Sequence, residues 1–365
     1  MIKRRFYDYL KNSKRFSSKS VEKYEKAIWR WEDFSNHADF ADFNPTAAIA
    51  FKEWLATKKK ARSQDSLGLS YRYDVLRFLK LFFEWLSKQP GYKRINQTAV
   101  DYLNSSWAEA RMATQPRGIV YPSVEEIRTV IESIRGTSEV EMRDRALLSL
   151  VFLTGARISA TMTLPLKSFD RDKLIIIQDP AFGIKTKFSK RIVSALLPLS
   201  YKEPLNYFLA WFDYLQNKRN FTPNDPIFPA TKTKSELDNN ISYHNTGLVQ
   251  PTFWESSTTP RTIFKKRFAD AGVKYYHPHT LRHLLVKEFT KMPLTEEQKK
   301  AFSQNLGHDN IGTTFGSHGY GQLTEDRQIE VMKGIDLEGQ KEKMKYVFSE
   351  EALKQLLKEI NENKG

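Results

Sequence analysis

Apolar residues in roughly the first 110 positions recur every three or four residues, with lysines and arginines between them. This spacing is typical of helices that bury one face. The first such stripe consists of Val21, Tyr24, Ile28 and Trp31. Further helices are predicted after Asn44-Pro45, from Tyr73 to Leu86, and from about Ala99 to Met112. We therefore expect residues 1–112 to form an all-helical domain whose aromatic side chains make an ordinary core.

Residues 113–122 contain two prolines and no periodic pattern, which predicts a linker. Ser123 and Glu126 follow at the spacing of a capping box, in which each side chain accepts from the other residue's backbone amide at a helix start. A second domain is expected from 123 to 336. The remaining tail, residues 337–365, has an apolar stripe that either packs on its own subunit or is exchanged between protomers. That stripe consists of Leu353, Leu356, Leu357 and Ile360.

The second domain mixes helices with a few strands. Leu174–Ile177 is rich in β-branched residues, Phe182–Lys187 is a second strand candidate, and Arg191–Leu197 follows a turn. Helices are expected at about 141–154, 204–217, 261–271, 279–290, 295–306, 324–333 and 349–361. The predicted fold class is thus mainly α, with a small antiparallel β-sheet that makes the second domain α+β.

The net charge of the chain indicates what kind of molecule it binds. Lys and Arg number 58 against 43 Asp and Glu, which gives a net charge of +15. An excess of this size is typical of a nucleic-acid-binding protein, although a basic protein with no such role is the alternative. One run of cations at the end of a predicted helix is a candidate phosphate contact: Lys58, Lys59, Lys60 and Arg62.

The sequence disfavours several other classes of protein and of catalytic site. The chain has no cysteine, which removes thiolate catalysis, disulfides and Cys-based zinc sites. No apolar run is long enough to span a bilayer, and the basic N-terminus lacks the apolar region of a signal peptide. No P-loop is present to support nucleotide-driven chemistry. We expect a protein of the cytoplasm, associated with the nucleoid, that makes no membrane contact.

Three short segments carry the residues that metal-free phosphodiester transfer requires, namely cations to clamp the phosphate, an acid and a nucleophile. Arg157 follows a glycine break between two predicted helices. His279 and Arg282 are three residues apart at the start of another helix, so they share one face. His308 follows a glycine at a helix end. Each segment alone is a weak signal, because a single histidine or arginine usually caps a helix or lies on the surface.

In this order, the segments Thr-Gly-Ala-Arg, His-Thr-Leu-Arg-His and Leu-Gly-His followed by Thr313-Thr314 resemble the signature boxes of the tyrosine recombinases, or phage-type integrases. The resemblance covers residues 123–336 specifically and the helical N-terminal part only in architecture. It implies a two-domain clamp on double-stranded DNA, a covalent 3′-phosphotyrosyl intermediate, and no metal, ATP or other cofactor. It further implies a tetramer on two DNA sites, DNA-bending accessory factors, and a mobile element as the genetic context.

The resemblance also implies roles for individual residues. Arg157 and Arg282 would clamp the scissile phosphate, His308 would donate to it, and His279 would assist proton transfer. The family's lysine lies on a β-hairpin, where Lys187 is the expected general acid. Lys185 is the alternative, since two residues along a strand it would point to the same face. Lys190 and Arg191 are expected to contact the DNA backbone.

The nucleophile departs from the family pattern. Some members read Ser-Tyr-Gly where this chain has Ser317-His318-Gly319, so His318 takes the place of the tyrosine and Tyr320 follows two positions later. Three readings stay open. Tyr320 attacks, helped by flexible flanking glycines. Alternatively, His318 marks a cleavage-deficient protein that only binds DNA. Thirdly, the His318 imidazole itself attacks.

Rival functions come from other classes. One is an architectural or regulatory DNA-binding protein without catalysis, and another is a related topoisomerase that nicks and reseals without a partner site. A metal site on His277, His279 and His283 is disfavoured, because no neighbouring carboxylate orients the rings.

Overall fold

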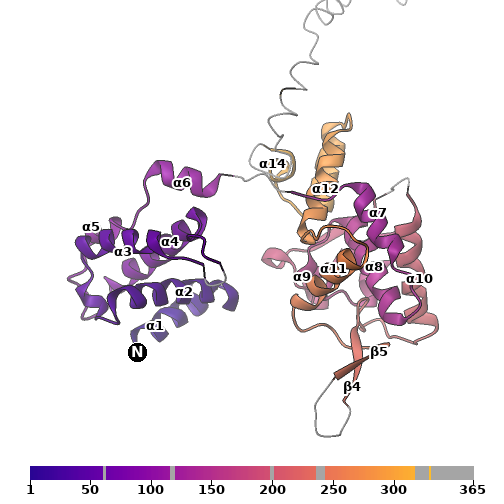
Figure 1. The fold of residues 1–365 in the computed structure, drawn as a ribbon, viewed down its shortest axis with the longest axis horizontal. Helices are drawn as coiled ribbons and strands as arrows, with labels where there is room; N and C mark the ends of the chain where they lie inside the picture. The colour runs from indigo at the N-terminus through magenta and orange to yellow at the C-terminus, as the bar shows by residue number, and fades with distance from the viewer. Residues whose placement is uncertain (61–62, 116–119, 198–200, 236–242, 317–328, 330–365) are drawn as a thin grey trace, which may run out of the picture. The chain divides into compact units, whose positions relative to one another are not determined.

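A computed structural model describes residues 1–60, 63–115, 120–197, 201–235, 243–316 and 329 of the chain. The chain divides into two compact units, Met1–Arg117 and Gly118–Gly365, each with its own hydrophobic core. The described part is mainly helical with small antiparallel sheets, which confirms the predicted fold class (Figure 1). The helices expected at 324–333, apart from residue 329, and at 349–361 lie outside the described residues.

The first unit is helical in its described residues, as predicted. Its helices are α1 (Ile2–Asp8), α2 (Ser18–Ser35), α3 (Pro45–Thr57), α4 (Leu69–Leu86), α5 (Gln97–Asp101) and α6 (Trp107–Thr114). The Asn44 side chain caps α3 by accepting from the amide of Ala47 at 2.9 Å. The core is dense in aromatic rings, as between Trp31 and Phe83, whose ring centroids are 5.1 Å apart.

Two predictions in this unit were wrong in detail. The single helix expected from Ala99 to Met112 is two helices, because Ser106 starts a new one by forming a capping box with Glu109. Helix α6 then continues through Thr114, so residues 113 and 114 are helical rather than part of an irregular linker. Both differences arise from polar caps that hydrophobic periodicity does not record.

The second unit begins as predicted, with the Ser123–Glu126 capping box at the start of α7 (Val124–Ser133). Helix α8 (Glu139–Thr154) runs through the core, and its residues from Ala146 to Thr154 are all buried. Neighbouring elements must cover this second half of the helix, because it is buried on every side and mostly apolar. The other helices are α9 (Ile158–Thr161), α10 (Glu203–Asn217), α11 (Thr258–Asp270), α12 (His279–Thr290), α13 (Glu296–Asn305) and α14 (Ile311–Phe315). None of the helices in the described ranges is long and apolar enough to cross a membrane.

A three-stranded antiparallel sheet follows α9. Its strands β1 (Phe169–Asp170), β2 (Ile175–Gln178) and β3 (Ile192–Ala195) lie in that order, with Ile175 opposite Ala195. The strand predicted at Phe182–Lys187 was wrong. This segment contains two short 3-10 turns, Pro180–Phe182 and Lys187–Ser189, and the buried side chain of Ile184 anchors it between them. The partner of β2 is therefore the later segment, at Arg191–Leu197.

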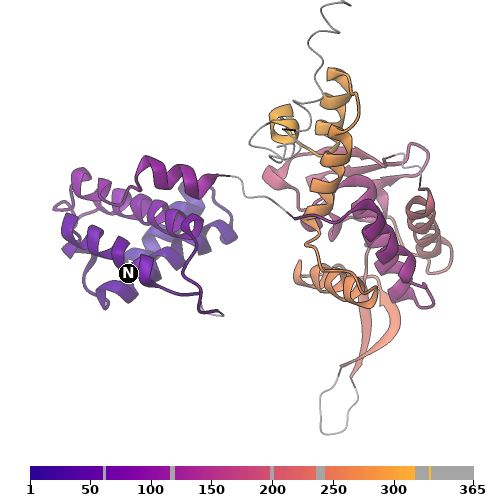
Figure 2. The same cartoon turned by 45° about the horizontal axis from the view of Figure 1, so that its top comes forward.

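A second sheet was missed altogether. Strands β4 (Ala230–Ser235) and β5 (Tyr243–Gln250) pair as an antiparallel hairpin that projects from the body of the second unit in both views (Figures 1 and 2). Its base is held by the buried carboxylate of Glu139 on α8, which accepts from the backbone amide of Val249 at 2.7 Å. The same carboxylate pairs with Arg219 at 2.5 Å.

Candidate active site

The first element of the site is the tight turn between α8 and α9. Gly155 ends α8 in the left-handed conformation, with φ of +61°. A Cβ at this position would lie only 2.8 Å from the Leu306 side chain, so the close approach requires glycine. Arg157 is the N-cap residue of α9 and is partly exposed. It therefore projects from the turn, as predicted.

Arg282 on α12 joins three segments that are distant in sequence. Its side chain is only 2% exposed. One Nη atom donates to the carbonyl oxygen of Gly155 at 2.9 Å. The other donates to the carbonyl oxygen of Leu306 and lies 2.6 Å from Nε2 of His308. A planar guanidinium can hold these acceptors together because its donors form a fixed fork.

His308 is buried, with 5% of its surface exposed, and its ring is held at both nitrogens. Nδ1 lies 2.8 Å from the hydroxyl of Thr314, which donates its single hydrogen to Ser303 Oγ at 2.8 Å. His308 Nδ1 is therefore the donor to Thr314, and Nε2 faces Arg282 as an acceptor. The network selects the neutral Nδ1–H tautomer.

The charges around His308 agree with this neutral ring. Burial, and after it the nearby cations in the order Arg282, Arg157, Lys187 and Lys190, together lower its pKa to about 3. Arg157 and Lys187 thus act electrostatically on the same ring as Arg282. Cations gathered around one buried ring favour a bound anion, and a phosphate carries the charge and acceptor oxygens that fit them.

His279 stands at the start of α12, one turn before His283, and the two ring centroids are 5.5 Å apart. Desolvation, then His283, Arg282 and Arg157, lower the pKa of His279 to about 4. The pKa of His283 is also about 4, mainly through desolvation. Both rings are neutral near pH 7 and can accept a proton. Across the described ranges, no group of three or more His, Asp or Glu side chains is placed to hold a metal ion.

The predicted lysines lie between β2 and β3, but not on a strand. Lys187 is exposed in a 3-10 turn, with its ammonium group 4.8 Å from the centroid of the exposed Phe188 ring. Lys185 does not share a strand face with Lys187, because its backbone amide donates to the Thr163 hydroxyl rather than to a strand partner. Phe188 adopts a left-handed φ of +61°, which turns the chain sharply between Lys187 and β3.

Two cations predicted to contact DNA already have carboxylate partners. Lys190 forms an ion pair with Asp309, the residue after His308. Arg191 pairs with Asp179 at 3.2 Å. Both pairs are largely exposed, so water weakens them and a phosphate can compete for the cations.

The cationic run of the first unit lies just after α3. Lys58 places its ammonium group 4.3 Å from the centroid of the Trp54 ring. Lys59 donates to Gln64 at 3.0 Å, and Lys60 pairs with Asp65 at 3.2 Å. Arg62, His318 and Tyr320 lie outside the described residues.

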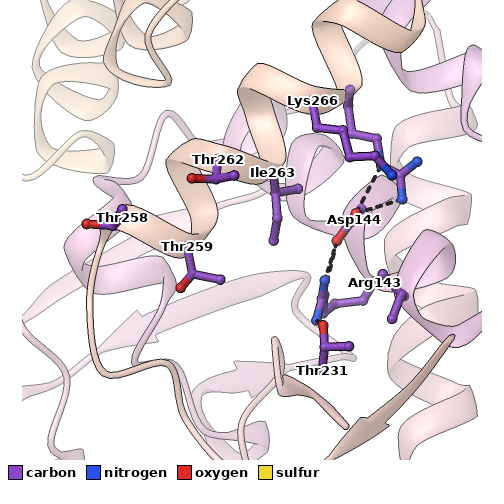
Figure 3. A pocket seen from close by; sticks show the side chains of 10 residues that line it. Arg143, Asp144, Thr231, Thr258, Thr259, Thr262, Ile263 and Lys266 are labelled. Carbon is purple, nitrogen blue, oxygen red and sulfur yellow. Dashed lines mark hydrogen bonds and ion pairs between the residues drawn. The ribbon is translucent and has the colours of Figure 1, made fainter. Parts of the chain in front are cut away.

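Sequence reasoning missed a second polar cluster, which lies away from the residues above. Asp144 on α8 accepts from Arg143 at 2.7 Å through one oxygen and from Arg267 on α11 at 2.8 Å through the other, all three being buried (Figure 3). Thr258, Thr259, Thr262 and Lys266 of α11 line a pocket of about 300 Å³ beside this network. Of the predicted catalytic residues that the structure describes, none lines the pocket. The network ties α11 to α8 and thereby fixes the segment that leads into α12.

Residues 123–320, more than half of the chain, match the sequence model of the phage integrase family. Similar sequences include the tyrosine recombinase XerC of Actinobacillus succinogenes, 24% identical over 315 residues that cover 85% of this chain and 89% of the relative. XerC of Escherichia coli O157:H7 is 22% identical over 317 residues, covering 85% of this chain and 88% of that protein.

Solved structures resemble the fold at low sequence identity. A lambda integrase (residues 75–356) dimer bound to a COC′ core site matches with a TM-score of 0.55 and 14% identity, covering 89% of this chain and 95% of that chain. XerH site-specific recombinase bound to difH substrate matches with a TM-score of 0.55 and 14% identity, covering 90% and 83% respectively.

Proposed function

The chain belongs to the phage integrase, or tyrosine recombinase, family, and from this premise we propose that it cuts and rejoins DNA at specific sites. The observation that carries the proposal is the convergence of Arg282, Arg157 and Lys187 on the buried ring of His308. These cations come from separate segments, and we place the scissile phosphate among them, at a position called the phosphate pocket below.

In the proposed reaction a tyrosine hydroxyl attacks the scissile phosphorus, and the bond from phosphorus to the 5′ oxygen breaks. The enzyme keeps the 3′ phosphate as a phosphotyrosyl ester. The departing 5′ oxygen takes a proton from the Lys187 ammonium, and the tyrosine proton passes to neutral His279. Arg157 and Arg282 stabilise the negative charge that develops on the non-bridging oxygens. The ester then reacts with a 5′ hydroxyl of the partner strand, which reverses these transfers.

His308 has a distinct part in this scheme. Nε2 of the neutral ring accepts from Arg282, so in this form His308 has no proton to offer a phosphate. A bound phosphate offsets the charges of Arg282 and Arg157, which raises the pKa of His308 toward its ordinary value. The ring then becomes able to donate from Nε2 to a non-bridging oxygen, while Nδ1 stays on Thr314.

The first candidate for the nucleophile is Tyr320, with Gly319 and Gly321 beside it. A second candidate function, DNA binding without cutting, is favoured by His318, because other family members have tyrosine at this position. In that case the chain binds recombination sites without cutting them. A phosphohistidine formed by His318 is the third reading.

Nicked suicide substrates, which trap the cut state because the 5′ fragment diffuses away, separate these readings. An adduct lost in Tyr320→Phe supports Tyr320 as the nucleophile, and an adduct lost only in His318→Ala supports histidine. Recovery of cutting in His318→Tyr shows that the fold expects a tyrosine at 318. Absence of any adduct, with intact site binding, supports the binding-only function. Full-rate cutting by both Arg157→Ala and Arg282→Ala would refute the proposed site.

We further propose the assembly that goes with this chemistry. Residues 1–112 and 123–336 grip a duplex as a two-domain clamp, using Lys58, Lys59, Lys60 and Arg62 in the first part. Four protomers act on two DNA sites, with residues 337–365 exchanged between protomers, in or near the nucleoid. Deletion from about residue 340 is expected to weaken pairing of two sites and spare single-site binding. A two-site strand-exchange assay distinguishes this function from that of a topoisomerase, which needs only one duplex.

A further inference from the structure

The outer edge of β3 is bound to the segment that ends in His308. Residues 190–195 and 305–309 run in opposite directions and are joined by three pairs of contacting residues. Lys190 pairs with Asp309, Ile192 packs against Gly307, and Ala195 bonds with Asn305. The lysine-bearing loop and the His308 turn therefore share one interface.

Asn305 makes the most specific of these contacts. It is the last residue of α13, and its side-chain oxygen accepts from the Ala195 amide at 2.6 Å. Its side-chain amide donates to the Ala195 carbonyl oxygen at 3.2 Å. One side chain thus satisfies both backbone groups of an edge strand, as a neighbouring strand would.

A series of hydrogen bonds through Ser194 also links the sheet to the end of α13. The Ser194 hydroxyl donates to the backbone carbonyl oxygen of Asn305 at 2.7 Å and accepts from the Gln178 side chain at 3.0 Å. Gln178 lies on β2, so these hydrogen bonds tie β2 and β3 to the end of α13. Next to it, Ile192 packs so closely that a Cβ on Gly307 would lie 2.4 Å from its Cδ1 atom.

We propose that Asn305 is a positioning residue that sets the register of β3 against the His308 turn and so holds Lys187 at the phosphate pocket. This inference rests on the proposed cleavage function. Lys187 lies five residues before Ile192 on the same chain, beyond the turn at Phe188. If β3 slides or lifts, the ammonium group moves with it. Asn305 itself contacts neither the phosphate nor the leaving oxygen, and it acts through β3.

The test compares two leaving groups in the full-length protein. An ordinary 5′ oxygen needs a proton from Lys187, whereas a 5′-bridging sulfur leaves as a stable thiolate and needs none. Asn305→Ala is expected to slow cutting of the ordinary suicide substrate about 10- to 100-fold, the order of a displaced catalytic group. Cutting of the phosphorothiolate substrate should stay within about threefold of wild type, as it should for Lys187→Ala.

Gln304→Ala, at the exposed neighbouring position of α13, is the matched control and should cut both substrates normally. Equal slowing of both substrates by Asn305→Ala would overturn the proposal, because it would indicate general damage to the pocket. Normal cutting of the ordinary substrate would overturn it as well. Site binding should be unchanged throughout, so that the loss appears in the cutting rate and not in affinity.

Failure of the proposed function gives a different pattern, since the wild-type protein then cuts neither substrate. In that case NMR titration of the His308 ring in the intact protein tests the same inference. Displacing Lys187 in Asn305→Ala removes a nearby positive charge, so the His308 pKa should rise relative to wild type and Gln304→Ala. An unchanged His308 titration would overturn the positioning role.

Discussion

A guanidinium nitrogen of Arg282 donates to the carbonyl oxygen of Gly155 at 2.9 Å, across 127 residues of sequence. The carbonyl belongs to the turn that presents Arg157, so one arginine supports the backbone from which the other projects. The two candidate phosphate ligands are therefore mechanically coupled.

The substitution Arg282→Lys tests whether the positive charge alone is sufficient or whether the planar guanidinium group is also needed. The lysine keeps the positive charge but cannot reach the Gly155 and Leu306 carbonyl oxygens and His308 at once. Adduct formation on a suicide substrate is expected to fall by about 10²- to 10³-fold. Unfolding in denaturant should show a loss of about 1.5 to 3 kcal/mol, the range for a charged hydrogen bond. Arg171→Lys, at an exposed position, is the control, and equal behaviour of the two variants would contradict the coupling.

Removal of the Thr314 hydroxyl should release the His308 ring. Thr314→Val leaves the buried Nδ1–H of His308 and the Ser303 hydroxyl without this partner. The free energy of unfolding is expected to fall by about 1 to 3 kcal/mol, and cutting should slow. Thr313→Val, at the exposed neighbour, should stay within about 0.5 kcal/mol of wild type. Similar values for both variants would argue against a role for the Thr314 hydroxyl in orienting the ring.

Stability should depend on pH through the buried His308. Its pKa is about 3 in the folded protein and lies near 6.5 in the unfolded chain. Between these values the unfolded chain binds more protons, so the contribution is complete above pH 6.5 and is lost as the pH falls toward 3. One such histidine contributes a slope of at most about 1.4 kcal/mol per pH unit. Denaturant unfolding between pH 7 and 4.5 should show a shallower decline for His308→Gln, and parallel curves would refute this assignment.

Substituting Gly307 and Gly183 by alanine distinguishes the cost of backbone strain from the cost of a steric clash. Both have positive φ, +73° and +81°, but only Gly307 has a close neighbour, the Ile192 side chain. Gly183→Ala is expected to cost about 1 to 2 kcal/mol from the left-handed backbone alone. Gly307→Ala should add about 1 to 3 kcal/mol of overpacking. Adding Ile192→Val removes the Cδ1 atom and should recover part of that addition. No recovery would mean that the β3 contact is looser than described.

The buried carboxylate of Asp144 should be important for folding. It bridges the buried Arg143 and Arg267, so Asp144→Asn leaves two desolvated cations poorly compensated. Breaking a buried ion pair in this way typically costs about 3 to 5 kcal/mol. Asp270→Asn, which alters a half-exposed partner of Arg267, is the control and should cost less than about 1 kcal/mol. Thermal or denaturant unfolding measures both, and a small effect at Asp144 would contradict the bridge.

Short-range sequence signals were enough for part of this structure. The turn before Arg157 was predictable because glycine after a buried helix marks a left-handed end. The shared placement of His279 and Arg282 on α12 followed from their spacing. The strand expected at Phe182–Lys187 failed because alternation cannot distinguish a strand from a looped segment anchored by one buried side chain, Ile184.

Other features depend on partners that are far away in sequence. Asn305 and Ala195 are 110 residues apart, and nothing near either residue indicates that they pair. Arg143, Asp144 and Arg267 have the appearance of ordinary charged helix positions until α8 and α11 are packed together. The β4–β5 hairpin was missed because its strands are polar, and among residues 246–250 of β5, whose burial is described, only Val249 is fully buried. Its stability depends on Glu139 rather than on an apolar pattern.

The position of Arg282 between Gly155 and Leu306 also affects when the protein can acquire its activity. Chains leave the ribosome N-terminus first, and domains fold as they emerge. Helix α8 and Arg157 are therefore synthesised long before the residues that complete their support. A nascent chain that ends just before residue 308 has Arg157 and Lys187 but lacks the His308 ring on which these cations act. If the chain cuts DNA as proposed, this activity can therefore arise only after synthesis has passed His308.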